Sequence, residues 1–281
     1  MEKYSKVQLG DTKKQEEFEQ KVKDIIYLAP ETVSPPEIVE QIDALKEQMF
    51  GIKNSFQEIK VHFNDLILSI EDKIKAETEN SAHPLKTALK YAMMGNYIDF
   101  GAMKNVDEEH LFKMIENPDS INLNEAEFQN FERELKSAKK FVFLTDNCGE
   151  IVFDKVFIGI IRKLYSDIEI TAIVRGNPTL NDATMEDALQ IGLDKIVKVI
   201  GNGTAIAGTC MEKISSEAQE KIMSADVILS KGQGNFETLR GSGKNVYYAF
   251  MCKCEMFSKR FNVPKFTGMF INDLRTDLTD L

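Results

Sequence analysis

Polar side chains suited to metal and phosphate chemistry follow short apolar runs in the second half of the chain. Asp146 and Asn147 come directly after one such run, and Asp182 lies in the loop after the next one. Lys231 and Lys253 follow two later runs. Carboxylate and amide oxygens are ligands for divalent cations, and lysines can neutralise negative charge on phosphoryl oxygens. This combination of residues predicts phosphoryl transfer with a bound metal ion.

Two glycines beside these side chains predict a close approach of the backbone to a ligand. Gly149 stands near the start of a predicted helix, where backbone N–H groups can bind a phosphate. Gly232 directly follows Lys231, and its lack of a side chain leaves room for a bound group. Both glycines therefore fit an anionic substrate held beside the metal.

Each of these polar residues also has a purely structural interpretation. The Asp-Asn pair that begins at Asp146 can form a turn or cap a helix, and Asp182 occupies a typical helix N-cap position. Glu150 can serve as a first-turn acid that complements the helix dipole. For Asn96 and Asp99, which lie between predicted helices, the favoured interpretation is a turn that ends a helix.

The first half of the chain is predicted to be helical. Apolar residues recur three and four positions apart between about residues 12 and 137, which is the spacing of an amphipathic helix. A proline-containing stretch interrupts this pattern, and Pro36 can begin the next helix. The predicted helices cover residues 11–26, 36–49, 59–74, 84–94, 107–115 and 124–138.

From residue 139 onward, short apolar runs alternate with helical patterns. This alternation predicts βαβ units and a parallel sheet with helices on both faces. Right-handed crossovers place the carboxyl ends of such strands along one edge, where ligands of open α/β sheets bind. The predicted strands cover 141–144, 169–174, 196–200, 227–229 and 246–250, and the predicted helices cover 152–164, 184–191, 213–224 and a short segment near Phe236.

The composition argues against several other classes of protein. A net charge of −10 over 281 residues disfavours nucleic-acid binding, which normally uses a basic face. No apolar run approaches the roughly 20 residues of a membrane-spanning helix, and the first residues lack the apolar segment of a signal peptide. The four cysteines form no CxxC pair, so we expect reduced cysteines and a cytoplasmic protein. No pattern specifies an oligomeric state.

Four ordered motifs resemble those of the damage-control phosphatase family, also called the acidic-residue-methyltransferase-like family. Segments 95–101 and 34–37 also resemble its helical part, so the resemblance covers nearly the whole chain. Cys148 stands where the family commonly has Ala or Ser. The four motifs are Asp146-Asn-x-Gly-Glu150, Arg175-Gly-Asn-Pro-x-x-Asn-Asp182, Lys231-Gly-Gln-Gly-Asn235 and Lys253-Cys254.

This resemblance implies a Rossmann-like α/β/α core with a mostly parallel sheet, preceded by an N-terminal helical bundle. It also implies a divalent-metal-dependent phosphatase that uses Mn²⁺, Mg²⁺, Co²⁺ or Ni²⁺ and hydrolyses small phosphorylated metabolites such as sugar phosphates. By motif position, the metal ligands are Asp146, Asn147 and Asp182. The residues expected to contact the substrate are Gly149, Glu150, Arg175, Asn177, Lys231, Gly232, Asn235 and Lys253.

The leading hypothesis is a metal-dependent phosphatase with a helical region at 1–138 and a catalytic region at 139–281, integrated in one structural unit. Its catalytic residues are Asp146, Asn147, Asp182 and Lys231, and Asp146 either holds the metal or attacks phosphorus itself. Two alternatives remain. One is a carboxyl methyltransferase that uses S-adenosylmethionine, and the other is a non-catalytic protein that binds phosphorylated metabolites.

Overall fold

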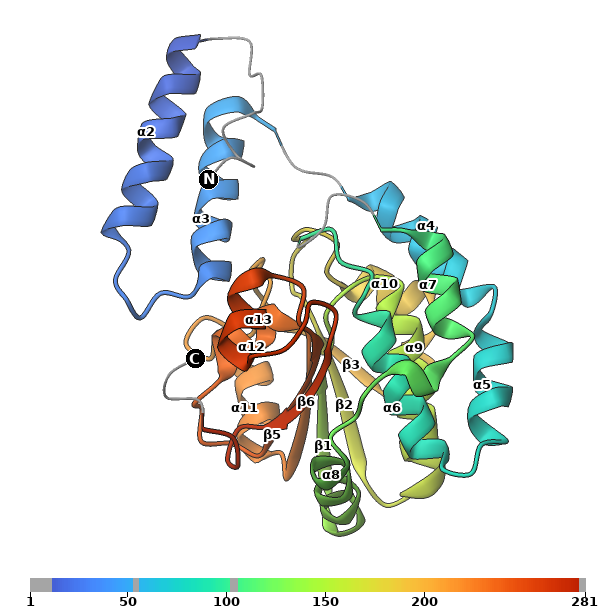
Figure 1. Ribbon diagram of the computed structural model, residues 1–281. Helices are drawn as coiled ribbons and strands as arrows, with labels where there is room; N and C mark the ends of the chain where they lie inside the picture. Colours follow the sequence, from blue (N-terminus) through green and yellow to red (C-terminus); the bar gives the residue numbers. More distant parts are fainter. Residues whose placement is uncertain (1–11, 53–55, 102–105, 278–281) are drawn as a thin grey trace. The chain divides into compact units, whose positions relative to one another are not determined.

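Six strands form a single sheet in the order β3-β2-β1-β4-β5-β6 (Figure 1). Strands β1 to β5 are parallel, and β6 runs antiparallel to β5. Side chains of β1 alternate between two apolar cores, with Phe141 and Phe143 in one core and Val142 and Leu144 in the other. The strands are Lys140–Leu144 (β1), Glu169–Val174 (β2), Lys198–Gly201 (β3), Val227–Lys231 (β4), Val246–Met251 (β5) and Gly268–Asn272 (β6).

The computed structural model describes residues 12–52, 56–101 and 106–277. The chain separates into two compact units, Met1–Ser55 and Phe56–Leu281. The second unit therefore combines the sheet with most of the helices that precede it in the sequence. The predicted division between residues 138 and 139 marks the change from helices to strands, and as a functional boundary it stays a prediction.

Helices cover both faces of the sheet in the second unit. One face shares its apolar core with α4 to α10, and the other with α11 to α13 (Figure 1). This arrangement confirms the predicted Rossmann-like α/β/α core, which a series of helices precedes in the sequence. The helices are Gln57–Leu68 (α4), Glu71–Glu79 (α5), Pro84–Gly95 (α6), Glu108–Ile115 (α7), Glu125–Ser137 (α8), Glu150–Leu164 (α9), Met185–Gln190 (α10), Ser216–Ser224 (α11), Gln233–Leu239 (α12) and Glu255–Phe261 (α13).

The helix α9 is the buried helix that directly follows β1. Its residues from Glu150 to Ile158 are all buried. Among the helices of the described chain, α9 and α6 form the most extensive helix–helix packing. This packing brings Asn96, which directly follows α6, to the start of α9. Glu150 and Asp154 lie one turn apart on α9 and are completely buried.

Several elements differ from the sequence prediction. The helix predicted at 59–74 is divided into α4 and α5, because the chain turns at Ser69 and Ile70. The antiparallel strand β6 and the short helix α13 were not predicted. The predicted helix start at Asp11 lies outside the described residues, while the helix itself is seen as α2, Thr12–Leu28.

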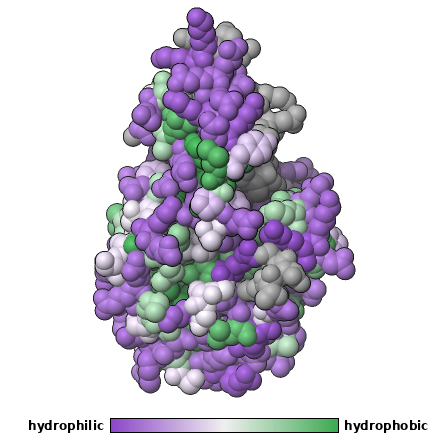
Figure 2. All heavy atoms as spheres, turned by 90° about the vertical axis from the view of Figure 1, so that its left-hand side faces the viewer, coloured by the Kyte–Doolittle hydropathy of each residue, from purple (hydrophilic) through white to green (hydrophobic). Residues whose placement is uncertain are grey.

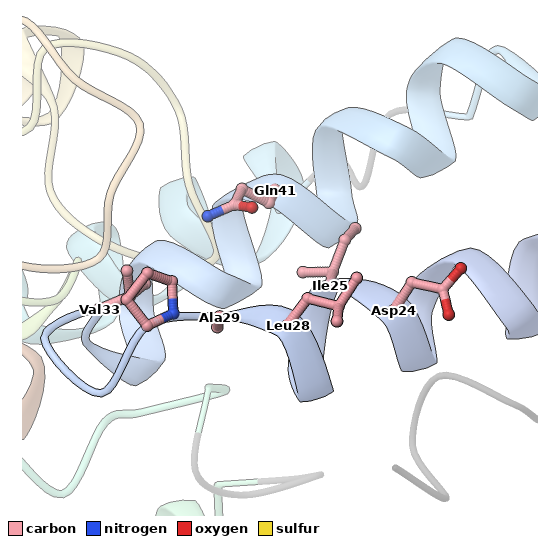
Figure 3. A pocket seen from close by; sticks show the side chains of 7 residues that line it. Asp24, Ile25, Leu28, Ala29, Val33 and Gln41 are labelled. Carbon is pink, nitrogen blue, oxygen red and sulfur yellow. The ribbon is translucent and has the colours of Figure 1, made fainter.

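The first unit contains α2 and α3, Pro35–Phe50. Phe18 and Val22 of α2 pack with Ile42 of α3 in a small apolar core. Ser34 caps α3 through a reciprocal pair of contacts with Glu37. A cavity of about 330 Å³ lies against α2, α3 and their connection (Figure 3), lined by Asp24, Ile25, Leu28, Ala29, Pro30, Val33 and Gln41.

The surface seen in Figure 2 is predominantly hydrophilic, and its hydrophobic residues form small separate groups. Within the ranges that the structure describes, no helix combines the length and the apolar character needed to cross a lipid bilayer. The apolar residues of the second unit are instead concentrated in the two cores that flank the sheet.

Candidate active site at the carboxyl edge of the sheet

The strand order reverses between β1 and β4, which is the position where open α/β sheets bind ligands. The chain leaves β1 to one side, toward β2 and β3, and then returns to form β4 on the other side. The loops after β1, β2 and β4 therefore meet beside this reversal, and the loop after β5 lies next to them. Each loop carries one of the four sequence motifs.

Backbone hydrogen bonds join the loop after β1 to the loop after β2. The N–H of Ala183 donates to the carbonyl of Asp146 at 2.7 Å, and the N–H of Cys148 donates to the carbonyl of Asn181 at 2.8 Å. Between them, Asn147 and Asp182 form an isolated antiparallel bridge. The three predicted metal ligands are thus brought together by main-chain contacts, although 36 residues separate Asp146 from Asp182.

Arg175 links the two carboxylates from the end of β2. Its Nε donates to Asp182 Oδ2 at 2.6 Å, and its Nη2 lies 3.4 Å from Asp146 Oδ1. Its Nη1 donates to Asn235 Oδ1 at 2.9 Å and to the carbonyl of Gly208 at 3.0 Å. Arg175 is buried among these partners, so it holds residues of the site together. Its predicted contact with a substrate stays a prediction.

Two asparagines and one glutamate surround the carboxylate of Asp146. Asn147 Nδ2 donates to Asp146 Oδ2 at 2.7 Å and to Glu150 Oε2 at 2.8 Å. Asn96 Nδ2 donates to Asp146 Oδ2 at 3.0 Å and to both oxygens of Glu150 at 3.1 Å. The Asn96 side chain also accepts the N–H of Met251 at 2.9 Å. Asn96 is therefore a central member of the site, and its interpretation as only a helix-ending turn is wrong.

Lys231 lies beneath this group, at the end of β4, and has no exposed surface. Its Nζ donates to Glu150 Oε1 at 2.6 Å, to Asp154 Oδ1 at 2.8 Å and to the carbonyl of Ala92 at 2.8 Å. These three contacts use all three N–H bonds of an ammonium group. Lys231 was expected to contact the substrate; the structure places its side chain in the interior, and a contact with substrate stays a prediction.

Lys253 approaches the site from the end of β5. Its Nζ donates to Asp99 Oδ2 at 2.7 Å. Burial raises the pKa of Asp146, and the positive charge of Lys253 partly opposes that rise. Asp99 is part of the same segment as Asn96, between α6 and α7. The ion pair of Lys253 with Asp99 closes one side of the group around Asp146.

Gly232 passes directly against the Asp146 carboxylate. Its φ angle is +80°, and a Cβ atom built there would lie 2.0 Å from Asp146 Oδ2. No side chain fits this position. The close approach predicted for Gly232 is therefore made by the protein's own carboxylate, whose position the glycine backbone helps to set.

The other predicted contact residues have protein partners. The N–H of Gly149 donates to Asn64 Oδ1 at 2.7 Å, so it is not open to a phosphate as the sequence suggested. Asn235 donates to the carbonyls of Thr145 and Lys231 and accepts from Arg175. Asn177 is exposed in the outer part of the loop after β2. Whether any of these residues contacts a substrate stays a prediction.

Burial dominates the electrostatics of the carboxyl groups. It raises the pKa of Asp146 well above its usual value, and the charges of Asp182 and Glu150 raise it further against the opposing effect of Lys253 and Arg175. Burial also raises the pKa of Asp182 to about 6, although Arg175 acts in the opposite direction. Closely spaced, buried carboxylates of this kind are stabilised when a cation lies between them.

The donor set fits a hard divalent cation. The amide N–H₂ group of Asn147 is directed to Asp146 and Glu150, which leaves Oδ1 as its remaining polar atom. Neither Asn147 Oδ1 nor Asp182 Oδ1 accepts a hydrogen bond from the residues that the structure describes. Among those same residues, no group of three or more His, Cys, Asp or Glu side chains is placed to hold a metal. A cation here would depend on the Asn147 amide oxygen as a third protein ligand.

Two further buried residues next to the site were not identified from the sequence. Asp154 binds Lys231, and Asn64 binds Gly149 while its amide group donates to Asp187. The signal for Asp154 was present, because a second acid four residues after Glu150 lies on the same face of an otherwise apolar helix. Such a pair inside a buried helix requires a cationic partner.

Comparison with known proteins gives consistent results for sequence and structure. A family model described as the damage-control phosphatase ARMT1-like domain matches residues 2–267. A damage-control phosphatase of Pyrococcus horikoshii is 34% identical over 221 residues, which are 78% of this chain and 74% of that protein. A damage-control phosphatase of Archaeoglobus fulgidus is 33% identical over 221 residues, covering 77% of this chain and 75% of the relative.

One other relative and one solved structure extend this comparison. An uncharacterized protein of Methanocaldococcus jannaschii is 35% identical over 219 residues, which are 74% of this chain and 70% of that protein. The crystal structure of a DUF89 family protein from Pyrococcus horikoshii superposes with a TM-score of 0.80 at 28% identity. That superposition covers 94% of this chain and 91% of the other. The fold and the sequence therefore point to one family.

Proposed function

Because this chain belongs to the damage-control phosphatase ARMT1-like domain family, we propose that it is a divalent-metal-dependent phosphatase acting on phosphomonoesters of small metabolites. The observation that carries the proposal is the convergence of Asp146, Asn147 and Asp182 beside the reversal of the strand order. The relatives support the phosphatase activity through their names, and the donor set supports the metal.

The three oxygen-bearing side chains would hold Mg²⁺, Mn²⁺, Co²⁺ or Ni²⁺. When bound, such a cation polarises phosphoryl oxygens and increases the acidity of a coordinated water molecule. Arg175 holds Asp146 and Asp182 in a fixed relation through its hydrogen bonds to both carboxylates. These hydrogen bonds would pre-organise the two carboxylates before a cation binds.

Lys253 is the lysine best placed to act on a phosphoryl group. Its charge acts on Asp146. Its side chain is buried, and among the described residues Asp99 is the side-chain partner of its Nζ. Neutralisation of charge as the phosphate oxygens become more negative is a large contribution to phosphoryl transfer. Lys231, in contrast, has all its donors occupied in the interior, so we assign it a positioning role.

Limited access to the carboxylates favours small substrates. Asp146 is 7% exposed and Asp182 is 3% exposed, so little of either carboxylate is accessible. A terminal phosphomonoester, as in a sugar phosphate, can approach such residues more readily than a phosphate on a protein surface. The net charge of −10 also disfavours polyanionic substrates such as nucleic acids.

A phosphate-release screen tests the proposed function. Purified protein would be incubated with sugar phosphates, nucleotides and phosphopantetheine derivatives in the presence of Mg²⁺, Mn²⁺, Co²⁺ or Ni²⁺, and with EDTA as the control. We expect metal-dependent release from at least one class of small phosphomonoester. Binding of these compounds without release under every metal would support the non-catalytic alternative and contradict the proposal.

A further inference from the structure

Glu150 is a buried carboxylate whose two oxygens are both fully used by the protein. Oε1 accepts from Lys231 Nζ at 2.6 Å and from Asn96 Nδ2 at 3.1 Å. Oε2 accepts from the Asn147 backbone N–H at 3.2 Å, from Asn147 Nδ2 at 2.8 Å and from Asn96 Nδ2 at 3.1 Å. Five contacts from three residues leave Glu150 no acceptor site for a substrate.

The contact with Asn147 has a consequence for the orientation of its amide group. Both N–H bonds of Asn147 Nδ2 are directed to carboxylate oxygens, one of Asp146 and one of Glu150. The oxygen and nitrogen of an amide are fixed relative to each other, so Oδ1 must point away from both carboxylates. A flipped amide would place Oδ1 against two carboxylates and would present an N–H₂ group, which cannot bind a cation, in its place.

We propose that Glu150, held by Lys231, is a positioning residue that fixes the amide of Asn147 with its oxygen directed to the metal. Lys231 Nζ donates to Glu150 Oε1 at 2.6 Å, and the same ammonium group also donates to Asp154 Oδ1 at 2.8 Å. All three side chains are completely buried. Water therefore cannot replace a partner that is lost from the ion pair of Lys231 with Glu150 or from that of Lys231 with Asp154. The inference rests on the metal site of the proposed function.

The expected effect is on metal affinity rather than on substrate contact. Residues that orient a metal ligand typically change metal affinity or activity by about 10- to 100-fold when they are replaced. In Glu150→Gln, one of the two acceptor oxygens becomes an N–H₂ group. That group opposes the donors of either Asn147 or Lys231, and the amide of Asn147 loses its fixed orientation.

Asp154→Asn is the matched control. It makes the same change from carboxylate to amide, on the same helix, at a residue that is equally buried and binds the same lysine. Asp154 makes no contact with Asn147, and Lys231 keeps Glu150 as its anionic partner in this variant. We expect Asp154→Asn to change the Kd for the metal by less than threefold.

Calorimetric titration of the full chain with Mn²⁺, without substrate, measures the effect directly. Glu150→Gln should raise the Kd for Mn²⁺ by about 10- to 100-fold. Its phosphatase kcat should recover at saturating Mn²⁺, and its KM for the phosphomonoester should stay within threefold of the wild-type value. Should Glu150→Gln fail to fold, Glu150→Asp keeps the charge toward Lys231 and withdraws the carboxylate from Asn147 by one methylene.

The outcomes separate this inference from the proposed function. An unchanged Kd for Mn²⁺ in both Glu150 variants would overturn the inference. A raised KM would then indicate a substrate contact, and a lower thermal stability alone would indicate a purely structural role. A Kd raised equally by Asp154→Asn would also overturn it. Weaker Mn²⁺ binding by Glu150→Gln alone, in a protein that releases no phosphate from any substrate, would support the inference while the phosphatase proposal fails.

Discussion

Substitution of Gly232 by alanine should move the Asp146 carboxylate out of its position. The added Cβ would lie 2.0 Å from Asp146 Oδ2 and 2.2 Å from its Cγ. Ordinary van der Waals contact begins at 3.4 Å, so the Cβ atom and this oxygen must separate by a further 3.4 − 2.0 = 1.4 Å. The oxygen cannot move freely, because Asn96 and Asn147 both bind it.

Misplacement of a catalytic group by about 1 Å can lower the rate by about 100-fold. We therefore expect Gly232→Ala to lower kcat/KM by about 100-fold or more and to weaken binding of Mn²⁺. The φ angle of +80° adds a cost of roughly 1–2 kcal/mol in folding stability for any residue with a Cβ. Phosphate release, Mn²⁺ calorimetry and urea denaturation measure the three quantities.

Gly241→Ala is the matched control for the backbone strain. Gly241 has a φ angle of +74°, and a Cβ atom there would meet nothing within 4 Å. It should lose a similar 1–2 kcal/mol of stability and keep its activity. If Gly232→Ala were as active as Gly241→Ala, the position of the Asp146 carboxylate would not control the reaction, and the site would have been identified wrongly.

Three further predictions concern other parts of the molecule. Asn96→Ala should lower stability by about 1–3 kcal/mol, because the buried N–H of Met251 loses its acceptor; equal stability in urea denaturation would contradict the role of Asn96. Burial raises the pKa of Glu237 from 4.5 to about 7, against the opposing charges of Arg240 and Arg260. The contribution of this carboxyl group to stability is therefore fully present below pH 4.5 and lost as the pH rises through 7. Glu237→Gln should gain up to about 3 kcal/mol relative to the wild type between pH 4.5 and pH 8, and a difference that does not vary with pH would refute this. Calorimetric titration with S-adenosylmethionine, with and without Mn²⁺, should show no binding, whereas binding in the micromolar range would favour the methyltransferase alternative.

Most of the parallel strands could be predicted because they are buried on both faces. Four of the six residues in the run 169–174 are apolar, and the same bounds are found in β2. The edge strand β6 lacks this signal, because its first residues, Gly268 and Met269, are only partly buried. The helix α13 has seven residues, too few to show a clear helical period.

Residues of the candidate site could be predicted from the sequence only where they lie in the segment that follows a strand. Asp146 and Asp182 were found in this way, since loops after parallel strands converge at one edge. Asn96 follows a helix, and only the packing of α6 against α9 reveals that it binds Asp146. The burial of Lys231 was missed because its partners Glu150 and Asp154 lie 81 and 77 residues away in the sequence.

The most direct test of the account compares the wild type with Asp146→Ala in a phosphate-release assay on a small phosphomonoester. The wild-type protein should release phosphate with Mn²⁺, stop after EDTA treatment and recover when a divalent metal is restored. Asp146→Ala should bind Mn²⁺ much more weakly in calorimetry and release no phosphate above background at any metal concentration. Full turnover by Asp146→Ala, or undiminished activity of the wild type in EDTA, would contradict a metal-dependent reaction at this site.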